Sequence, residues 1–263
     1  MDKQTLADYV NRLHASSRYT FTTVESQQTT GLSRDALKKA LSRLEQQKRI
    51  VVLRRGFCVI VPLEYQASGI LPPDWFIEDL MKFIKQPYYV ALLSAAELHG
   101  AAHQRPQAFQ VITSEATREI QSAGLRIRFF KKANLAATPT VKKRTFTGDI
   151  PVSTPAATAL DLVAYERRIG RLNRVLTVLQ ELGESIEEES LVAATQTCEK
   201  PYAQRLGWLL DKAGFESVTG KLHEWLKCQE SKAVALDPSR PAKGFARDPK
   251  WSVIVNTEVE GEL

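Results

Sequence analysis

Residues 22–62 read TTVESQQTTGLSRDALKKALSRLEQQKRIVVLRRGFCVIVP, and this stretch decides the fold of the N-terminal part of the chain. Ser33 follows a turn at Gly31 and stands where a helix N-cap is expected. Apolar residues then recur at helical spacing, at Ala36, Leu37, Ala40, Leu41 and Leu44. The stretch therefore predicts an amphipathic helix over residues 33–47 with a basic outer face.

Shorter elements are predicted before and after this helix. A preceding helix over residues 22–30 opens with Thr22 and Glu25 in the spacing of a capping box. After the main helix, two β-rich runs at 50–53 and 57–61 are separated by three residues, which is typical of a hairpin. Two helices joined by a glycine turn and followed by a hairpin predict a winged helix-turn-helix.

An additional amphipathic helix at the start of the chain completes this prediction. Leu6, Tyr9, Val10 and Leu13 line one face of that helix, which would cover the other two helices. We therefore expect residues 1–62 to form a winged helix-turn-helix DNA-binding domain with a core of three helices.

The charge of the chain is unevenly distributed. Residues 1–62 hold eleven Lys and Arg against five Asp and Glu, whereas the remainder holds 25 of each sign. The whole excess of the formal net charge of +6 thus lies in the first quarter of the chain. This asymmetry favours binding to a phosphate backbone and predicts an affinity that falls steeply with salt.

The predicted helix over 33–47 would enter the major groove, and its first turns would lie nearest the bases. Threonine and serine side chains at the helix turn would donate to phosphates, and two arginines at the hairpin tip would reach the backbone or the minor groove. The candidate DNA-binding residues are Thr29, Thr30, Ser33, Arg34, Asp35, Lys38, Lys39, Arg43, Arg54 and Arg55.

The rest of the chain predicts a second, larger domain of mixed α and β structure. Residues 63–73 have the Gly and Pro content of a linker, and the second domain would span 74–263. Residues 109–113 and 125–130 alternate as strands do, and the second run predicts a sheet with one solvated face. From residue 151 onward the chain is mostly helical, so the predicted class is α+β.

Local signals in this second part predict where its helices begin. Ser94 with Glu97 has the spacing of a capping box, and Thr154 precedes a proline at the first position of a helix. Asp161 lies within the helix that follows Thr154, where we expect a solvated or capping role.

A second basic region lies in the middle of the chain. It is either a surface that holds the DNA backbone beside the hairpin or an ordinary solvated face. Its residues are Arg126, Arg128, Lys131, Lys132, Lys142, Lys143 and Arg144.

Signals for catalysis or metal binding are weak. The sequence has no Gly-rich phosphate loop, nucleophile elbow or HExxH motif, and three cysteines fall in no paired spacing. His99 and His103 with Glu97 suggest a metal site, but Gly100 separates the two histidines and no third ligand pattern follows. We therefore expect no metal, no cofactor and no enzymatic activity. A membrane span and a secretory signal are not predicted either, which indicates a cytoplasmic protein.

Longer blocks of the sequence resemble the AbiEi family, the antitoxins of type IV abortive-infection systems. The blocks are YYVALLSAAELHGAAHQRPQAFQVIT, DIPVSTPAATALDLV, RLNRVLTVLQEL, QRLGWLLDKAG and residues 29–62, and the resemblance spans roughly residues 6–255. It implies a winged helix that represses its own operon at inverted repeats and an α+β antitoxin domain. It also implies a nucleotidyltransferase toxin, opposed without a stable complex.

Two other classes of function remain open. A ligand-sensing winged-helix regulator would hold an apolar pocket with convergent polar groups in its second domain. A DNA-processing nuclease would need acidic residues on neighbouring strands to hold a metal ion, and the two clearest strands, residues 107–113 and 125–130, carry none.

Overall fold

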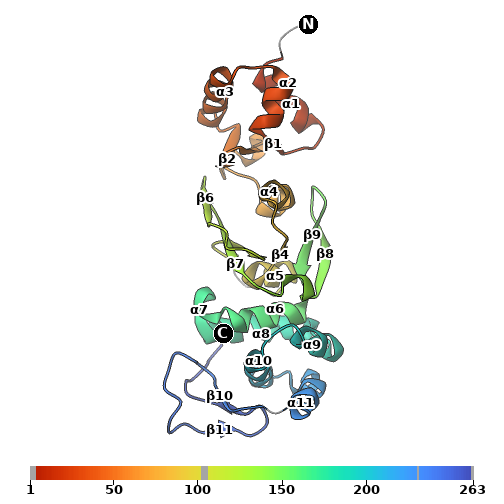
Figure 1. The fold of residues 1–263 in the computed structure, drawn as a ribbon, viewed down its shortest axis with the longest axis vertical. Coiled ribbons are helices and arrows are strands. Elements are labelled where there is room, and N and C mark those ends of the chain that lie inside the picture. The colour runs from red at the N-terminus through yellow and green to blue at the C-terminus, as the bar shows by residue number, and fades with distance from the viewer. Residues whose placement is uncertain (1–3, 102–105, 230, 262–263) are drawn as a thin grey trace.

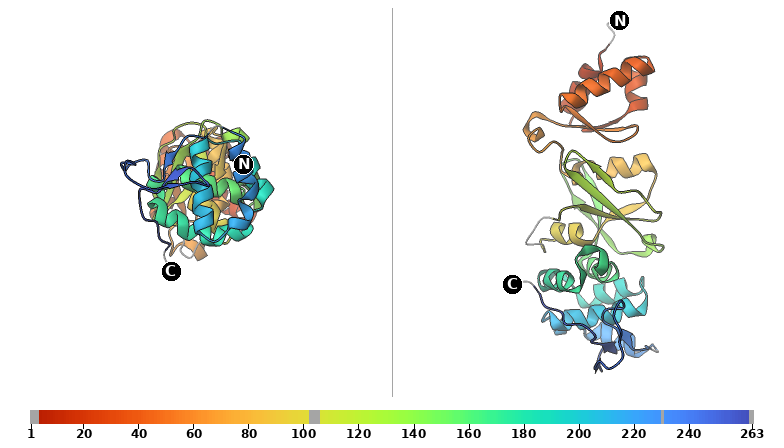
Figure 2. Two further views of the ribbon diagram at one scale, coloured as in Figure 1. Left: turned by 90° about the horizontal axis from the view of Figure 1, so that it is seen from below. Right: turned by 90° about the vertical axis from the view of Figure 1, so that its left-hand side faces the viewer.

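The computed structural model describes residues 4–101, 106–229 and 231–261. These residues form an elongated stack of three tiers, with the N-terminus at one end (Figures 1 and 2). We call them the N-terminal tier (residues 5–62), the sheet tier (residues 63–153) and the helical tier (residues 154–261). The α+β class predicted from the sequence is confirmed. None of the helices in the described residues is long and apolar enough to cross a membrane.

The N-terminal tier contains the helices and the hairpin at the predicted positions. Its elements are α1 (Leu6–Ala15), β1 (Thr20–Thr22), α2 (Thr23–Thr30), α3 (Arg34–Gln46), β2 (Ile50–Arg54) and β3 (Phe57–Ile60). The strands form an antiparallel sheet in the order β1-β3-β2. Strand β1 was not predicted, because a strand of three residues is too short to show a clear alternation.

The sheet tier is built on a six-stranded mixed sheet. Its elements are η1 (Leu63–Tyr65), η2 (Pro73–Trp75), α4 (Ile77–Ile84), β4 (Tyr88–Val90), α5 (Leu92–Leu98), β5 (Phe109–Thr113), β6 (Ile120–Ser122), β7 (Leu125–Lys131), η3 (Leu135–Ala137), β8 (Thr140–Arg144) and β9 (Asp149–Ser153). The strand order is β6-β7-β5-β4-β9-β8. Pairs β5–β7 and β4–β9 are parallel, and the other neighbours are antiparallel.

Alternate residues of this sheet enter two different apolar cores. Ile127 and Phe129 pack with α4 on the side of the N-terminal tier, whereas Phe130 packs with the helices of the helical tier. The expectation of one solvated face is therefore wrong at the centre of the sheet. Of the two arginines of β7 that suggested a wet face, Arg126 is exposed, whereas Arg128 is half-buried with its guanidinium over the ring of Phe130.

The helical tier packs beneath the sheet (Figure 1). Its elements are α6 (Pro155–Ala164), α7 (Glu166–Ile169), α8 (Arg171–Leu182), η4 (Gly183–Ser185), α9 (Glu188–Thr195), α10 (Lys200–Lys212), η5 (Glu216–Val218), α11 (Gly220–Lys227), β10 (Val234–Ala235), β11 (Arg247–Asp248) and β12 (Val253–Ile254). The last three strands form a small sheet in the order β10-β12-β11.

Two predicted helix starts in these tiers have different outcomes. Thr154 caps α6 as predicted, because its hydroxyl accepts a hydrogen bond from the amide of Ala157 at 3.3 Å. The capping role predicted for Ser94 is wrong. Helix α5 already begins at Leu92, and the Ser94 hydroxyl accepts a hydrogen bond from the amide of Gln110 at 2.9 Å.

Asp161 is buried, so the predicted solvated or capping role is wrong. Its carboxylate lies 2.8 Å from the ammonium of Lys132 and accepts a hydrogen bond of 2.9 Å from the hydroxyl of Tyr89. Burial raises the pKa of the Asp161 carboxyl, and Lys132 opposes that shift. The three side chains join β4, the end of β7 and α6 through one polar cluster inside the apolar core.

The segment predicted as a linker, residues 63–73, forms the start of the sheet tier and is partly packed. Ile70 and Leu71 are buried, and they belong to the same apolar core as α4 and one face of the N-terminal sheet. The segment 63–73 is therefore exposed at its start, where Leu63 is 81% exposed, and packed at its end.

Candidate nucleic-acid interface

Helix α3 is held in place by its apolar stripe. Leu37 and Leu44 are buried against Leu6, Tyr9 and other residues of α1 in the core of the N-terminal tier. This packing fixes which side of α3 faces outward, because residues three and four apart share one face of a helix.

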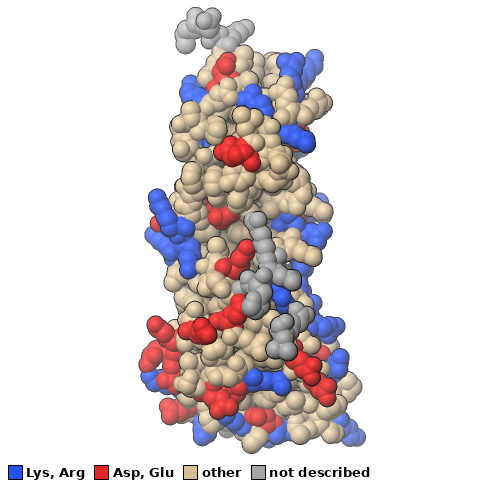
Figure 3. Space-filling model, turned by 180° about the vertical axis from the view of Figure 1, so that it is seen from behind, with Lys and Arg blue, Asp and Glu red and all other residues tan. Residues whose placement is uncertain are grey.

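The outward side of α3 carries its charged side chains. Ser33 sets the first turn, since its hydroxyl accepts a hydrogen bond from the amide of Ala36 at 3.3 Å. The exposed residues of this face are Arg34, Asp35, Lys38, Lys39 and Arg43. In the view from behind, Lys and Arg side chains reach the surface of the N-terminal tier beside a few acidic ones, and acidic side chains are more prominent over the helical tier, where basic ones also lie (Figure 3).

The turn between α2 and α3 depends on a glycine. Gly31 has a φ of 66°, in the left-handed region, and its amide donates to the carbonyl of Gln27 at 2.9 Å. The hydroxyls of Thr29 and Thr30 both donate within α2, to the carbonyls of Glu25 at 3.0 Å and Ser26 at 2.7 Å, but Thr29 is exposed whereas Thr30 is buried. The side chain of Thr30 is therefore not placed to contact a phosphate.

An ion pair strengthens the start of α2. Arg18 lies 2.5 Å from Glu25, which also forms a capping box with Thr22. Burial of Glu25 is the largest single effect and opposes ionisation, but the hydrogen bond and charge of Arg18, with smaller contributions from Thr22 and Tyr9, together hold the pKa of the Glu25 carboxyl below its ordinary value.

The hairpin tip lies against α4 instead of projecting freely. Arg54 and Arg55 are exposed, as an interface would require. The next residue, Gly56, has a φ of 94°, and a Cβ added to it would lie 3.2 Å from the ring of Phe83. The arginines can therefore reach a ligand only along the side of the hairpin that α4 leaves open.

The residues of the predicted second basic region do not form one surface. Arg126 and Arg128 lie on β7, and both contact the carboxylate of Glu119, at 3.1 and 3.6 Å. Lys131 is exposed at the end of the same strand. Lys132 is bound to the buried Asp161, and only 16% of its side chain remains exposed.

The remaining members of that region lie at the opposite edge of the sheet. Lys142, Lys143 and Arg144 belong to β8, which is the last strand in the order, whereas β7 is next to the first. Arg144 contacts Asp149 of the neighbouring strand at 3.4 Å. The sheet thus separates the predicted region into two small groups.

Arginines that the sequence analysis missed lie next to β7. Residues 167–174 contain four arginines, and Arg168 and Arg174 line the same cavity as Arg126 and Arg128. The spacing of Arg168, Arg171 and Arg174 could be seen in the sequence as a basic cluster. Helix periodicity could not show that this cluster lies near β7.

The structure offers little support for a metal site. The Nε2 of His99 lies 2.7 Å from the carbonyl of Ser153, and burial, the main cause, lowers its pKa. His103 lies outside the described residues. Over the described residues, no group of three or more His, Cys, Asp or Glu side chains could hold a metal ion.

Taken together, these features define an α+β protein that carries a basic N-terminal tier on a body of a mixed sheet and helices. Residues 89–212 match the family model described as the AbiEi antitoxin C-terminal domain. The match over this part, which runs from β4 to the end of α10, supports an antitoxin of the AbiEi family.

A solved structure shares the fold along nearly the whole chain. It is the crystal structure of the RV2827C protein from Mycobacterium tuberculosis, with a TM-score of 0.68 and 16% sequence identity. The likeness covers 96% of this chain and 92% of that chain. A search of curated proteins gave no match to the sequence.

Proposed function

We propose that this protein is a DNA-binding autorepressor and the antitoxin of a type IV toxin-antitoxin system that acts in phage defence. Residues 1–62 would read the operator as a winged helix-turn-helix, and residues 74–263 would carry the antitoxin activity. Residues 63–73 would connect them.

The observation that carries the DNA-binding proposal is the outward face of α3. Its cationic side chains are exposed, while the opposite face is held in the core by Leu37 and Leu44. A helix fixed in this way can enter a major groove without losing side-chain packing. Arg34, Lys38 and Lys39 would then lie near the bases, and Asp35 would accept from a cytosine amino group.

Contacts to the phosphate backbone would flank that helix. Thr29 and Ser33 lie beside the first turn of α3, where amides and hydroxyls can donate to a phosphate. Arg43 would reach a phosphate from the last turn of α3, and Arg54 and Arg55 from the side of the hairpin. One copy of the chain would bind each half of an inverted repeat in its own promoter.

The antitoxin half of the proposal rests on the family match. Members of this family are antitoxins, and the partner that the resemblance implies is a nucleotidyltransferase toxin. We propose that the chain opposes the effect of such a toxin without forming a stable complex and without catalysing a reaction.

The DNA-binding half is tested on the promoter fragment upstream of the gene. Fluorescence anisotropy should show retention at low ionic strength and a linear fall of log affinity with log salt concentration. Replacement of Lys38 and Lys39 by Gln should weaken binding to the operator, and replacement of Arg54 and Arg55 by Gln should reduce the salt slope by about two. Arg247→Gln in the helical tier is the matched control and should change neither quantity.

The antitoxin half is tested by co-expression with the adjacent reading frame. If that neighbour arrests growth, the wild-type chain should restore it. The variant with Lys38→Gln and Lys39→Gln should also restore growth while losing repression of the promoter. If this variant loses both activities although it folds normally, the two functions do not reside in separate parts of the chain.

A further inference from the structure

A cavity of about 270 Å³ lies between β7 and the start of the helical tier. Four arginines line it, two from β7 (Arg126 and Arg128), one from α7 (Arg168) and one from α8 (Arg174). Among the residues described along its wall, none is acidic. Guanidinium groups that converge on one cavity match the planar, multidentate geometry of phosphate oxygens.

The arginines are held in place by the protein itself. The guanidiniums of Arg128 and Arg168 both lie over the ring of Phe130, with Cζ atoms 5.3 and 4.3 Å from its centroid. Arg128 also donates to the carbonyl of Arg168 at 3.1 Å. One carboxylate, that of Glu119, serves both Arg126 and Arg128. Neighbouring guanidiniums repel each other, so an anion bound among them would be favoured in addition to Glu119.

The first turn of α8 adds to this positive potential. Ile169 and Arg174, which flank that turn, both line the cavity, and no described side chain caps the helix. The unsatisfied amides of a twelve-residue helix attract an anion at this end. Gly170 leaves room for the side chain of Arg174, because a Cβ at position 170 would lie 2.9 Å from the Cβ of Arg174.

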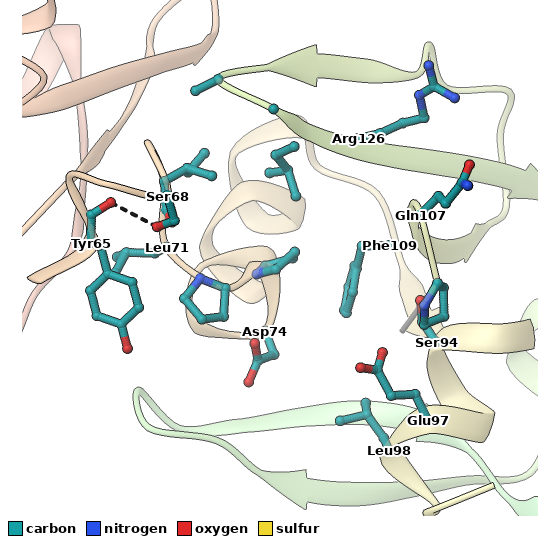
Figure 4. A pocket seen from close by; sticks show the side chains of 17 residues that line it. Tyr65, Ser68, Leu71, Asp74, Ser94, Glu97, Leu98, Gln107, Phe109 and Arg126 are labelled. Atoms are coloured by element: carbon teal, nitrogen blue, oxygen red, sulfur yellow. Dashed lines mark hydrogen bonds between the residues drawn. The ribbon is translucent and has the colours of Figure 1, made fainter. Parts of the chain in front are cut away.

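A larger cavity of about 550 Å³ adjoins the arginine cavity. The two share Pro106, Gln107 and Arg126 in their walls. In Figure 4 the ring of Phe109 lies at the centre of the larger cavity, with Glu97 on one side of it and Arg126 on the strand at the other.

The lining of the larger cavity differs in chemistry from that of the first. It combines apolar side chains such as Leu98 and Phe109 with Ser94 and the carboxylates of Asp74 and Glu97. Carboxylates repel a phosphate but accept hydrogen bonds from hydroxyl and amino groups. An aromatic ring offers a stacking surface for a planar base.

We propose that these adjoining cavities bind a nucleoside polyphosphate. The phosphates lie among Arg126, Arg128, Arg168 and Arg174, and the nucleoside occupies the larger cavity beside Phe109. The acidic side chains orient the ligand, because a phosphate is excluded from their side. This binding site is separate from α3 and does not depend on DNA recognition.

The test is calorimetric titration of the full-length protein with ATP, adenosine and inorganic tripolyphosphate. Wild-type protein should bind ATP more tightly than tripolyphosphate, and adenosine weakest of all. Replacing Arg168 and Arg174 by Gln should weaken ATP binding by at least about tenfold, since each charged hydrogen bond contributes substantially to affinity. Arg168→Lys, which keeps the charge but loses the planar fork, should weaken binding less.

Two control variants locate the binding. Arg247→Gln removes an exposed arginine of β11, and the variant with Lys38→Gln and Lys39→Gln removes cations of α3; both should bind ATP as the wild type does. Unfolding midpoints of all variants exclude loss of fold as the cause.

Three results would overturn the proposal. The first is wild-type affinity for ATP in the variant that lacks Arg168 and Arg174. The second is an equal loss in the Arg247→Gln control. The third is tripolyphosphate binding as tightly as ATP, which would remove the nucleoside from the larger cavity.

Discussion

The ring of Phe57 in the hairpin lies against the ring of Phe83 in α4, with centroids 5.3 Å apart and planes at 43°. This contact means that the N-terminal sheet has two buried faces. Phe21, Cys58 and Ile60 face the three helices, whereas Phe57 and Val59 face the sheet tier. The basic tier is therefore fixed to the body by an apolar core rather than carried on a flexible tether.

Further contacts hold the N-terminal tier against the sheet tier, and we call this region of contact the joint. The hydroxyl of Thr20 donates to the carboxylate of Asp79 at 2.5 Å. The ring of Tyr19 lies 5.3 Å from that of Trp75, which in turn stacks on Phe146 at 4.2 Å. Polar and aromatic contacts thus surround the apolar core of the joint, and the orientation of α3 is set relative to the whole molecule.

The joint predicts a large effect of Phe57→Ala. Removing this buried ring should lower the free energy of unfolding by about 3–5 kcal/mol, from lost burial and the cavity left behind. Urea denaturation of the full chain measures the change. Phe146→Ala, at a ring that is 62% exposed, should cost much less. Equal costs for the two variants would show that the joint does not contribute to stability in this way.

The buried ion pair predicts an asymmetric response to substitution. Asp161→Ala leaves the ammonium of Lys132 without its partner and should cost about 3–5 kcal/mol of unfolding free energy. Replacing Lys132 by Met together with Asp161 by Leu removes both charges and should recover part of that loss. Denaturation of the single and double variants measures the coupling. A double variant less stable than Asp161→Ala would contradict this account.

The exposed position of Arg34 at the start of α3 predicts a base-specific contact within the proposed DNA interface. Arg34→Ala should cost about 1–3 kcal/mol on operator DNA if the guanidinium binds both acceptors of one guanine. Competition titrations with operator and random duplexes measure this difference. A loss of equal size on both duplexes would identify Arg34 as a phosphate contact instead.

The pKa of Glu25 predicts how the stability of α2 depends on pH. Because the pKa is lowered in the folded state, ionised Glu25 stabilises the protein above its unfolded value of 4.5, and this stabilisation is lost as pH falls through the folded value. The pair is partly exposed, so Glu25→Gln should cost no more than about 1 kcal/mol at pH 7. The difference from wild type should shrink in denaturation series below pH 4.5. A difference that stays constant with pH would point to the capping amide rather than the charge.

Local signals in the sequence were sufficient where one residue and its neighbours decide the structure. Ser33, Thr22 and Thr154 mark helix starts because a cap depends on an amide three residues away. Gly31 marks a turn because few other residues adopt a positive φ without strain. Ser94 was wrongly predicted to cap a helix, because its hydroxyl bonds instead to an amide of β5, a strand that is distant in sequence.

The sequence alone determined the order of helices and hairpin in the N-terminal tier, the basic face of α3 and, through longer blocks, the AbiEi resemblance. Tertiary structure decided which charges remain at the surface: it buried Asp161 with Lys132, placed β7 and β8 near opposite edges of one sheet, and brought Arg168 and Arg174 beside Arg126 and Arg128. Periodicity places a residue on a face of its own element, whereas the pairing of distant elements depends on packing that no local pattern contains.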